Sequence, residues 1–193
     1  MAAHTYICLF DLPAYDKRVA PALREYQNRF NPSAVVALLR DIAGELQALR
    51  KDPDRQVPDS DDCQHWIDAI APDAGYKPSA DTVKELASML IQNLCVVYMQ
   101  EIGRFVPYLT ERSEWFADLM DGGEELAGGR LEFTFGSGAL IATRQQIRQF
   151  LDEVNRVPPP EGNLAADYAN LKRLLAEADA NRNYTVLKTD VAP

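Results

Sequence analysis

The pattern of hydrophobic and polar residues changes its period several times along the chain, and each change marks a predicted element. Residues 6–10 form an unbroken apolar and aromatic run, which Asp11 and Pro13 end. Such a run without polar alternation is typical of a strand that is covered on both faces. We therefore predict a central strand at residues 5–10.

Two helices are predicted next. Apolar residues at helical spacing between residues 19 and 30 predict a short helix, which tolerates Pro21 only in its first turn. Asn31 and Pro32 then supply an N-cap and a proline at the first helical position. The longer helix that follows is predicted to run to about Arg50.

The most hydrophobic segment comes after an aspartate-rich loop at residues 51–62 and a short helix that Pro72 ends. From Ser79 onward, apolar residues cover nearly the whole circumference of a helix, as expected for a helix packed on several sides. This helix is predicted to reach Phe105, because Pro107 disfavours its continuation.

A β-hairpin is predicted over residues 131–142. Apolar residues alternate with polar ones in its first half, which is the period of a half-buried strand. A two-residue Gly136-Ser137 turn would place Phe133 opposite Leu140, and a three-residue turn would shift this pairing by one position. Both registers keep large side chains on one face, so the register stays open.

The same segment allows a second interpretation, a phosphate-binding loop. If a helix started at Ala139, the glycine-rich stretch 136–138 would lie at its N-terminus, where main-chain N–H groups bind anions. However, Thr143 and Gln146 form a capping box that predicts a later helix start. Ile141 also stands where a dinucleotide-binding fingerprint needs its third glycine. We favour the hairpin.

The remaining elements complete an α+β fold. A helix at residues 144–156, a proline-rich connector, a helix from Asn163 and a closing strand follow the hairpin. The helices concentrate between the first strand and the hairpin, which argues against a doubly wound α/β sheet. We predict a single helix-rich α+β domain over residues 1–193, with a small antiparallel or mixed sheet of about four strands at residues 5–10, 131–135, 139–142 and 184–191.

Charge and hydropathy narrow the class of partner. The 193 residues carry a formal net charge of -9, which opposes association with nucleic acid and with anionic lipid. The N-terminus lacks the basic start of a signal peptide, and the longest apolar stretch, residues 88–99, is too short to span a bilayer. These observations predict a cytoplasmic protein that binds neither nucleic acid nor membranes and whose partner is a protein, a basic one in particular.

Few residues suit catalysis or metal binding. His4 and His65 are the only histidines, which leaves few routes to a Ser-His-Asp or Cys-His nucleophile. The three cysteines have no CxxC spacing and are expected to be reduced thiols in the core. A calcium loop starting at Asp52 fails, because Val57 replaces its required glycine and Cys63 its bidentate glutamate. No metal and no cofactor are therefore predicted.

Two groups of residues are candidates for binding. Polar side chains near the end of the most hydrophobic helix need partners if they are buried; together with the hairpin they give the ligand-binding candidates Gln100, Glu101, Arg104 and Phe133. Alternatively, Glu101 and Arg104 form a simple i,i+3 ion pair on the exposed end of this helix. An acidic surface beside large aromatic residues suits a protein partner; these candidates are Asp59, Asp61, Asp62, Trp66 and Trp115.

Three functions follow, in order of preference. The first is a non-enzymatic protein-binding, inhibitory or regulatory module with an acidic surface. The second is a small-ligand-binding protein that uses the region of Glu101. The third is an enzyme that uses a nucleotide at Gly136 to Gly138, or the Glu101 carboxylate. The sequence indicates no catalytic residues for such an enzyme and leaves the oligomeric state open.

Overall fold

The computed structural model describes residues 4–49, 60–102, 106–114, 117, 131–133 and 137–191. The chain groups into two compact units. Residues 1–12 and 96–193 form the first, which we call the sheet unit, and residues 13–95 form the second, the helical unit. A single domain over the whole chain stays a prediction.

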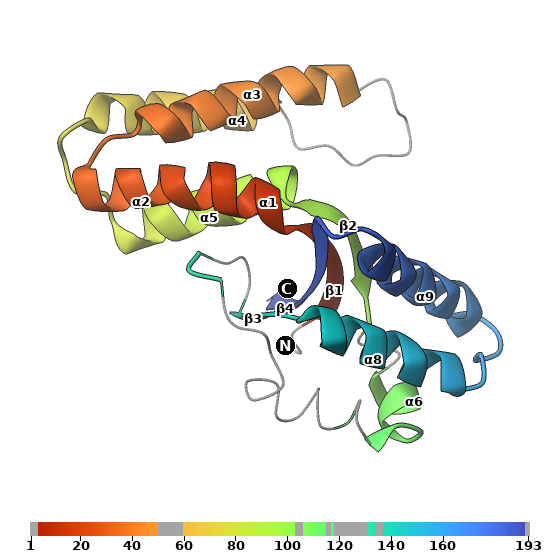
Figure 1. Ribbon diagram of the computed structural model, residues 1–193. Coiled ribbons are helices and arrows are strands. Elements are labelled where there is room, and N and C mark those ends of the chain that lie inside the picture. The colour runs from red at the N-terminus through yellow and green to blue at the C-terminus, as the bar shows by residue number, and fades with distance from the viewer. Residues whose placement is uncertain are drawn as a thin grey trace. The chain divides into compact units, whose positions relative to one another are not determined.

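The sheet unit contains a four-stranded antiparallel sheet (Figure 1). Its strands are β1 (His4–Asp11), β2 (Val96–Glu101), β3 (Ser137–Ile141) and β4 (Tyr184–Val191), in the order β2-β1-β4-β3. β1 lies inside this sheet and its residues 7–10 are all buried, which confirms the predicted central strand. β1 and β4 are neighbours, paired from His4 opposite Val191 to Asp11 opposite Tyr184. The helix-rich α+β class with a small antiparallel sheet is confirmed.

Two antiparallel helices cover one face of the sheet (Figure 1), α8 (Arg144–Arg156) and α9 (Leu164–Ala180). Their apolar stripes and the sheet share one core, whose buried members include Ile7, Leu9, Phe150, Leu171 and Val186. The predicted capping box of α8 is confirmed. The Thr143 hydroxyl accepts from the Gln146 N–H at 3.3 Å, and the Gln146 side chain accepts from the Thr143 N–H at 2.6 Å.

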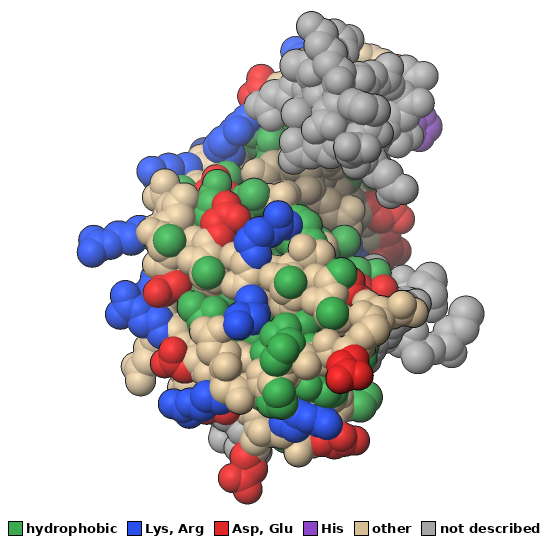
Figure 2. All heavy atoms as spheres, turned by 90° about the vertical axis from the view of Figure 1, so that its right-hand side faces the viewer, with side chains coloured by type: hydrophobic (Ala, Val, Ile, Leu, Met, Phe, Trp, Pro, Cys, Tyr) green, Lys and Arg blue, Asp and Glu red, His purple; other side chains and the backbone are tan. Residues whose placement is uncertain are grey.

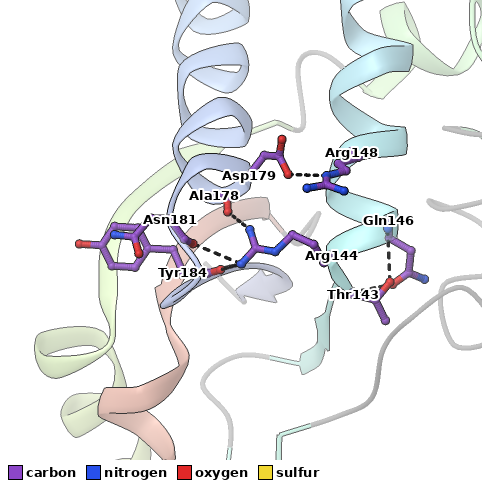
Figure 3. A network of polar contacts seen from close by, with 8 residues as sticks. All are labelled: Thr143, Arg144, Gln146, Arg148, Ala178, Asp179, Asn181 and Tyr184. Carbon is purple, nitrogen blue, oxygen red and sulfur yellow. Dashed lines mark hydrogen bonds and ion pairs between the residues drawn. The ribbon is translucent and has the colours of Figure 1, made fainter.

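An arginine on α8 caps the end of α9 (Figure 3). The guanidinium of Arg144 donates to three main-chain carbonyls, those of Ala178 near the end of α9, Asn181 just after it and Tyr184 at the start of β4. The last carbonyls of a helix have no partner within it. Arg144 supplies that partner and also suits the negative end of the helix dipole.

A tyrosine on α9 caps the end of α8 in return. The hydroxyl of Tyr168 donates to the carbonyls of Val154 and Val157. In a continuing helix the Val154 carbonyl would accept from residue 158, but that residue is Pro158, which has no N–H. The two helices are therefore joined at both ends by side chains that satisfy each other's carbonyls.

The predicted hairpin is wrong in its described part. Residues 132 and 133 form a bend and Leu131 has no regular structure, so none of the three is in a strand, and Ser137, predicted as a turn residue, starts β3. β3 pairs with β4, which is distant in sequence. Leu131 and Phe133 are both buried, so their alternation reports burial of one side of the segment, which does not require a strand. Gly136 lies outside the described residues.

The most hydrophobic segment divides into a helix and a strand. α5 (Ala80–Leu94) begins after Ser79, whose hydroxyl accepts from the main chain of its first turn, and β2 begins at Val96. The prediction of one helix up to Phe105 is wrong, because β2 pairs with β1 instead. Residues 96–98 are β-branched or aromatic, and such residues lose side-chain freedom in a helix but pack well on a sheet.

The helical unit consists of helices packed side by side (Figure 1), α2 (Ala20–Arg29), α3 (Ser33–Leu49), α4 (Ser60–Ile70) and α5. α3 packs against α4, and α2 packs against α3 and α5. The Asn31 side-chain oxygen accepts from the Ser33 N–H at 3.0 Å, as expected of a capping residue, but α3 begins at Ser33, so Pro32 precedes the helix instead of being its first residue. None of the described helices is long and apolar enough to cross a membrane.

A π turn accommodates Pro21. The short α1 (Leu12–Ala14) and the π-helical η1 (Tyr15–Val19) lead into α2 without a break, and the Ala20 N–H donates to the carbonyl of Tyr15, five residues earlier. Within an α-helix the ring of Pro21 would clash with a preceding carbonyl. The wider turn avoids this clash. Pro21 thus lies in the first turn of α2, as predicted, although helical backbone begins earlier.

Candidate functional site

β2 carries two of the most exposed large apolar side chains among the described residues. Val97 and Met99 leave 40% and 43% of their surface exposed. Met99 lies opposite Cys8 in the register and therefore points to the same face of the sheet as Cys8. The neighbouring Tyr98 and Gln100 point to the opposite face, where α8 and α9 pack.

The hydrogen-bonding pattern directs one edge of β2 away from β1. The Ile102 N–H donates to the Thr5 carbonyl of β1 at 2.9 Å, and the register pairs Gln100 with Ile7 in the same phase. In an antiparallel ladder the intervening residue directs its main-chain groups the other way. The N–H and C=O of Met99 therefore point away from β1. In the part of the chain that the structure describes, no strand pairs with β2 on this outer side.

The regular part of this edge is short. Pairing of β1 with β2 runs without interruption from Tyr6 opposite Glu101 to Leu9 opposite Tyr98, and the register then shifts so that Phe10 faces Val96. Val97 is the extra residue, so β2 bulges there. Bulges are one way in which proteins restrict pairing at a sheet edge.

On the face of β2 that packs against α8 and α9, Tyr98 and Gln100 make several polar contacts. The Tyr98 hydroxyl donates to the side-chain oxygen of Gln100 at 3.2 Å, and the Gln100 amide donates to the Glu101 carbonyl at 3.0 Å. The Arg173 guanidinium of α9 lies 5.3 Å from the centre of the Tyr98 ring, within the range of a cation–π interaction. Figure 2, which views the side of Figure 1 where β2 and α9 lie, shows hydrophobic side chains among charged ones of both signs.

The predicted ligand-binding residues are dispersed. Gln100 is buried and satisfied by the contacts above, Glu101 is half-buried at the end of β2, and Phe133 is buried in a bend. Arg104 lies outside the described residues. The helical spacing assumed for Glu101 and Arg104 is wrong, because Glu101 is on a strand. Their role in ligand binding stays a prediction.

The predicted protein-binding residues are described only in part. Trp66 is half-buried on α4, and the main chains of Asp61 and Asp62 belong to the first turn of the same helix. Asp59 and Trp115 lie outside the described residues. Their role also stays a prediction.

The geometry required for the phosphate-loop interpretation is absent from the described residues. Gly138 lies within β3, and the next helix, α8, starts only at Arg144. A helix start at Ala139 is therefore wrong, and the main-chain N–H groups of α8 are capped by Thr143 instead.

The thiols are core residues, as expected. Cys8, Cys63 and Cys95 are buried and none is in a disulfide. Burial raises the pKa of the Cys8 thiol to about 12, which keeps it protonated and poorly nucleophilic. Among the described residues, no group of three or more histidine, cysteine or acidic side chains could hold a metal ion.

The sequence contained a signal for β2 that the helical prediction overlooked. The predicted helix includes Val97 and Met99 in an apolar surface that covers nearly its whole circumference. The three consecutive β-branched and aromatic residues from Val96 to Tyr98 favour a strand, in which Val97 and Met99 alternate with Tyr98.

Comparisons of this chain with protein-family models, with curated proteins and with solved structures gave no match.

Proposed function

We propose that this chain is a non-enzymatic protein-binding module of the inhibitory or regulatory kind, and that the outer edge of β2 is its binding surface. The observation that carries the proposal is the position of Val97 and Met99, which are 40% and 43% exposed, two positions apart on one edge strand. Isolated apolar residues on a surface are ordinary. Two exposed apolar residues on a strand edge with which no described strand pairs are not ordinary, because such edges also present main-chain hydrogen-bonding groups to other chains.

The rigid support of this edge favours binding over mere exposure. The Tyr98 ring is held between its own hydrogen bond and the Arg173 guanidinium, and Gln100 is fixed by two hydrogen bonds. A surface that is ordered before it binds loses less conformational entropy on association. Tyrosine and arginine are also enriched among residues that contribute strongly to interfaces.

The test is capture of partners from native lysate by the full chain. Three immobilised forms are compared: the wild type, the double variant Val97→Lys/Met99→Lys, and the control Tyr76→Ser. Tyr76 is 73% exposed and belongs to the helical unit, so the control removes an exposed apolar side chain that is not part of β2. Circular dichroism verifies that all three forms are folded.

We expect a protein that the wild type and the control retain and that the double variant loses by at least about tenfold, the equivalent of about 1.4 kcal/mol. Equal retention by the double variant, or no retained protein at low or at moderate salt, overturns the proposal.

A further inference from the structure

We infer that the partner segment is an extended, basic stretch that adds to the sheet unit as a further strand beside β2, and this inference rests on the proposed function. In such β-augmentation, main-chain hydrogen bonds provide affinity and alternate side chains provide specificity. β2 meets the first requirement through Met99, whose N–H and C=O point away from β1.

The length of the added strand follows from the register. Uninterrupted pairing of β1 with β2 covers residues 98–101 of β2, and the bulge at Val97 ends it. A partner strand can therefore pair regularly only over this short stretch. Alternate residues of the added strand lie roughly 6.8 Å apart along it. One of them therefore lies opposite Met99, and the next lies opposite Glu101 at the end of β2.

The chemical character of the partner segment follows from the side chains that lie along this edge of β2. Val97 and Met99 offer apolar surface, and Glu101 adds a carboxylate at the end of the same strand. The chain as a whole has a net charge of -9, which attracts a basic segment and speeds its encounter. The matching segment therefore has two alternating apolar residues followed in space by Lys or Arg opposite Glu101.

A second copy of this chain fits the edge poorly. Antiparallel self-pairing of β2 centred on Met99 would place Val97 opposite Glu101, an apolar side chain against a carboxylate. It would also bring together two chains that each carry -9, which repel one another. These mismatches favour a basic partner over a homodimer.

The probe for this inference is the synthetic peptide acetyl-Lys-Thr-Lys-Thr-Val-Thr-Val-Thr-amide. In antiparallel orientation its first valine lies opposite Met99 and its second lysine opposite Glu101, while its second valine extends past the regular pairing toward Val97. Because residues opposite Met99 form hydrogen-bonded pairs, the valine N–H groups point toward β2 and the threonine N–H groups point away. N-methylation of the valines thus blocks the ladder, whereas N-methylation of the threonines is a matched control.

Binding is measured by fluorescence anisotropy with the full chain at low and moderate salt. We expect the peptide and its threonine-methylated form to bind alike. The valine-methylated form, a peptide with Glu in place of Lys, and the Val97→Lys/Met99→Lys protein are each expected to weaken binding by at least about tenfold. Added salt should weaken binding as well.

Two results overturn the inference. One is equal binding of the two methylated peptides or no binding of any, and the other is a wild-type dimer in sedimentation that the double variant abolishes. If lysate capture still depends on Val97 and Met99, only strand addition by a basic segment fails. If capture fails too, the proposed function falls with it.

Discussion

At the scale of single residues, two side chains donate hydrogen bonds to carbonyls at helix ends that lack a partner within the helix. Pro158 deprives the end of α8 of an N–H, and the Tyr168 hydroxyl takes its place at the Val154 carbonyl. Arg144 does the same for the end of α9. Both are long side chains with donors at their tips, so each reaches from its own helix to the other.

Replacing Tyr168 with Phe should lower the free energy of unfolding by about 1–3 kcal/mol at neutral pH, because buried carbonyls lose their donor. The pKa of Tyr168 is raised, mainly by burial and also by the neighbouring Tyr108. The folded state thus holds the phenol proton more tightly than the unfolded chain. This stabilisation is complete below the unfolded pKa of about 10 and is lost as the pH rises through the folded value.

Urea unfolding of the wild type and of Tyr168→Phe, at several values between about pH 8 and about pH 11, measures this dependence. The difference in unfolding free energy should shrink above about pH 10. Tyr76→Phe, at a 73% exposed position, serves as the control and should show no such trend. If the difference in unfolding free energy between the wild type and Tyr168→Phe stays constant across this pH range, the Tyr168 hydroxyl is not the source of the stabilisation.

Replacing Arg144 with Lys should cost about 1–3 kcal/mol, because one ammonium cannot reproduce the planar fork that reaches three carbonyls. The matched control is Arg148→Ala. Arg148 pairs with Asp179 at 2.9 Å, but its side chain is 66% exposed, so its loss should cost no more than about 1 kcal/mol. Thermal unfolding compares the two; a larger loss for Arg148→Ala would reverse their assigned roles.

At the scale of elements, local signals were sufficient where an element carries its own boundaries. The capping box at Thr143 placed the start of α8, and the apolar run at residues 6–10 placed β1. Local signals were insufficient where the pairing partner of a strand is distant in sequence. β3 pairs with β4 rather than with residues 131–133. Residues 96–101 form a strand because they pair with β1. Periodicity shows which side of a segment is buried, but it does not identify the element that covers it.

The same limit applies to the candidate site. Gln100 and Glu101 were singled out for their polarity, and the structure places them beside Val97 and Met99, whose exposure depends on strand order. Strand order is a property of the assembled sheet, and no feature of residues 96–101 alone specifies it.

The capping box offers a test at this scale. Thr143→Ala should destabilise the protein by about 1 kcal/mol, because the Gln146 N–H loses its acceptor. Gln146→Ala removes the reciprocal contact, and the double variant should cost less than the two single losses added together, since both contacts form one unit. Chemical denaturation of all three variants gives the coupling. Strict additivity would show that the two contacts act independently.

At the scale of the whole molecule, the helical unit is an insertion within a strand pair. β1 and β2 are adjacent and antiparallel, with Phe10 opposite Val96. The helical unit, residues 13–95, lies between these two strands in the sequence. Antiparallel neighbours are commonly joined by a two-residue turn. The sheet unit also has a core of its own, formed by β1, β4, α8 and α9.

We therefore predict that an Asn-Gly turn can replace residues 12–94 and leave the sheet unit folded. Asp11 and Cys95 would then flank a type I′ turn, whose twist suits a hairpin. Dispersed amide resonances and a cooperative thermal transition are the expected results. An unfolded product would instead favour the single domain predicted from the sequence.

The burial of all three thiols has a consequence for labelling chemistry. Cys8, Cys63 and Cys95 are each 1% exposed or less, and the Cys8 pKa of about 12 leaves almost no thiolate near neutral pH. The native protein should therefore react with Ellman's reagent no faster than it unfolds. A cysteine introduced at position 97 or 99 would then be its one rapidly reacting group, so a single dye could report directly on the edge of β2.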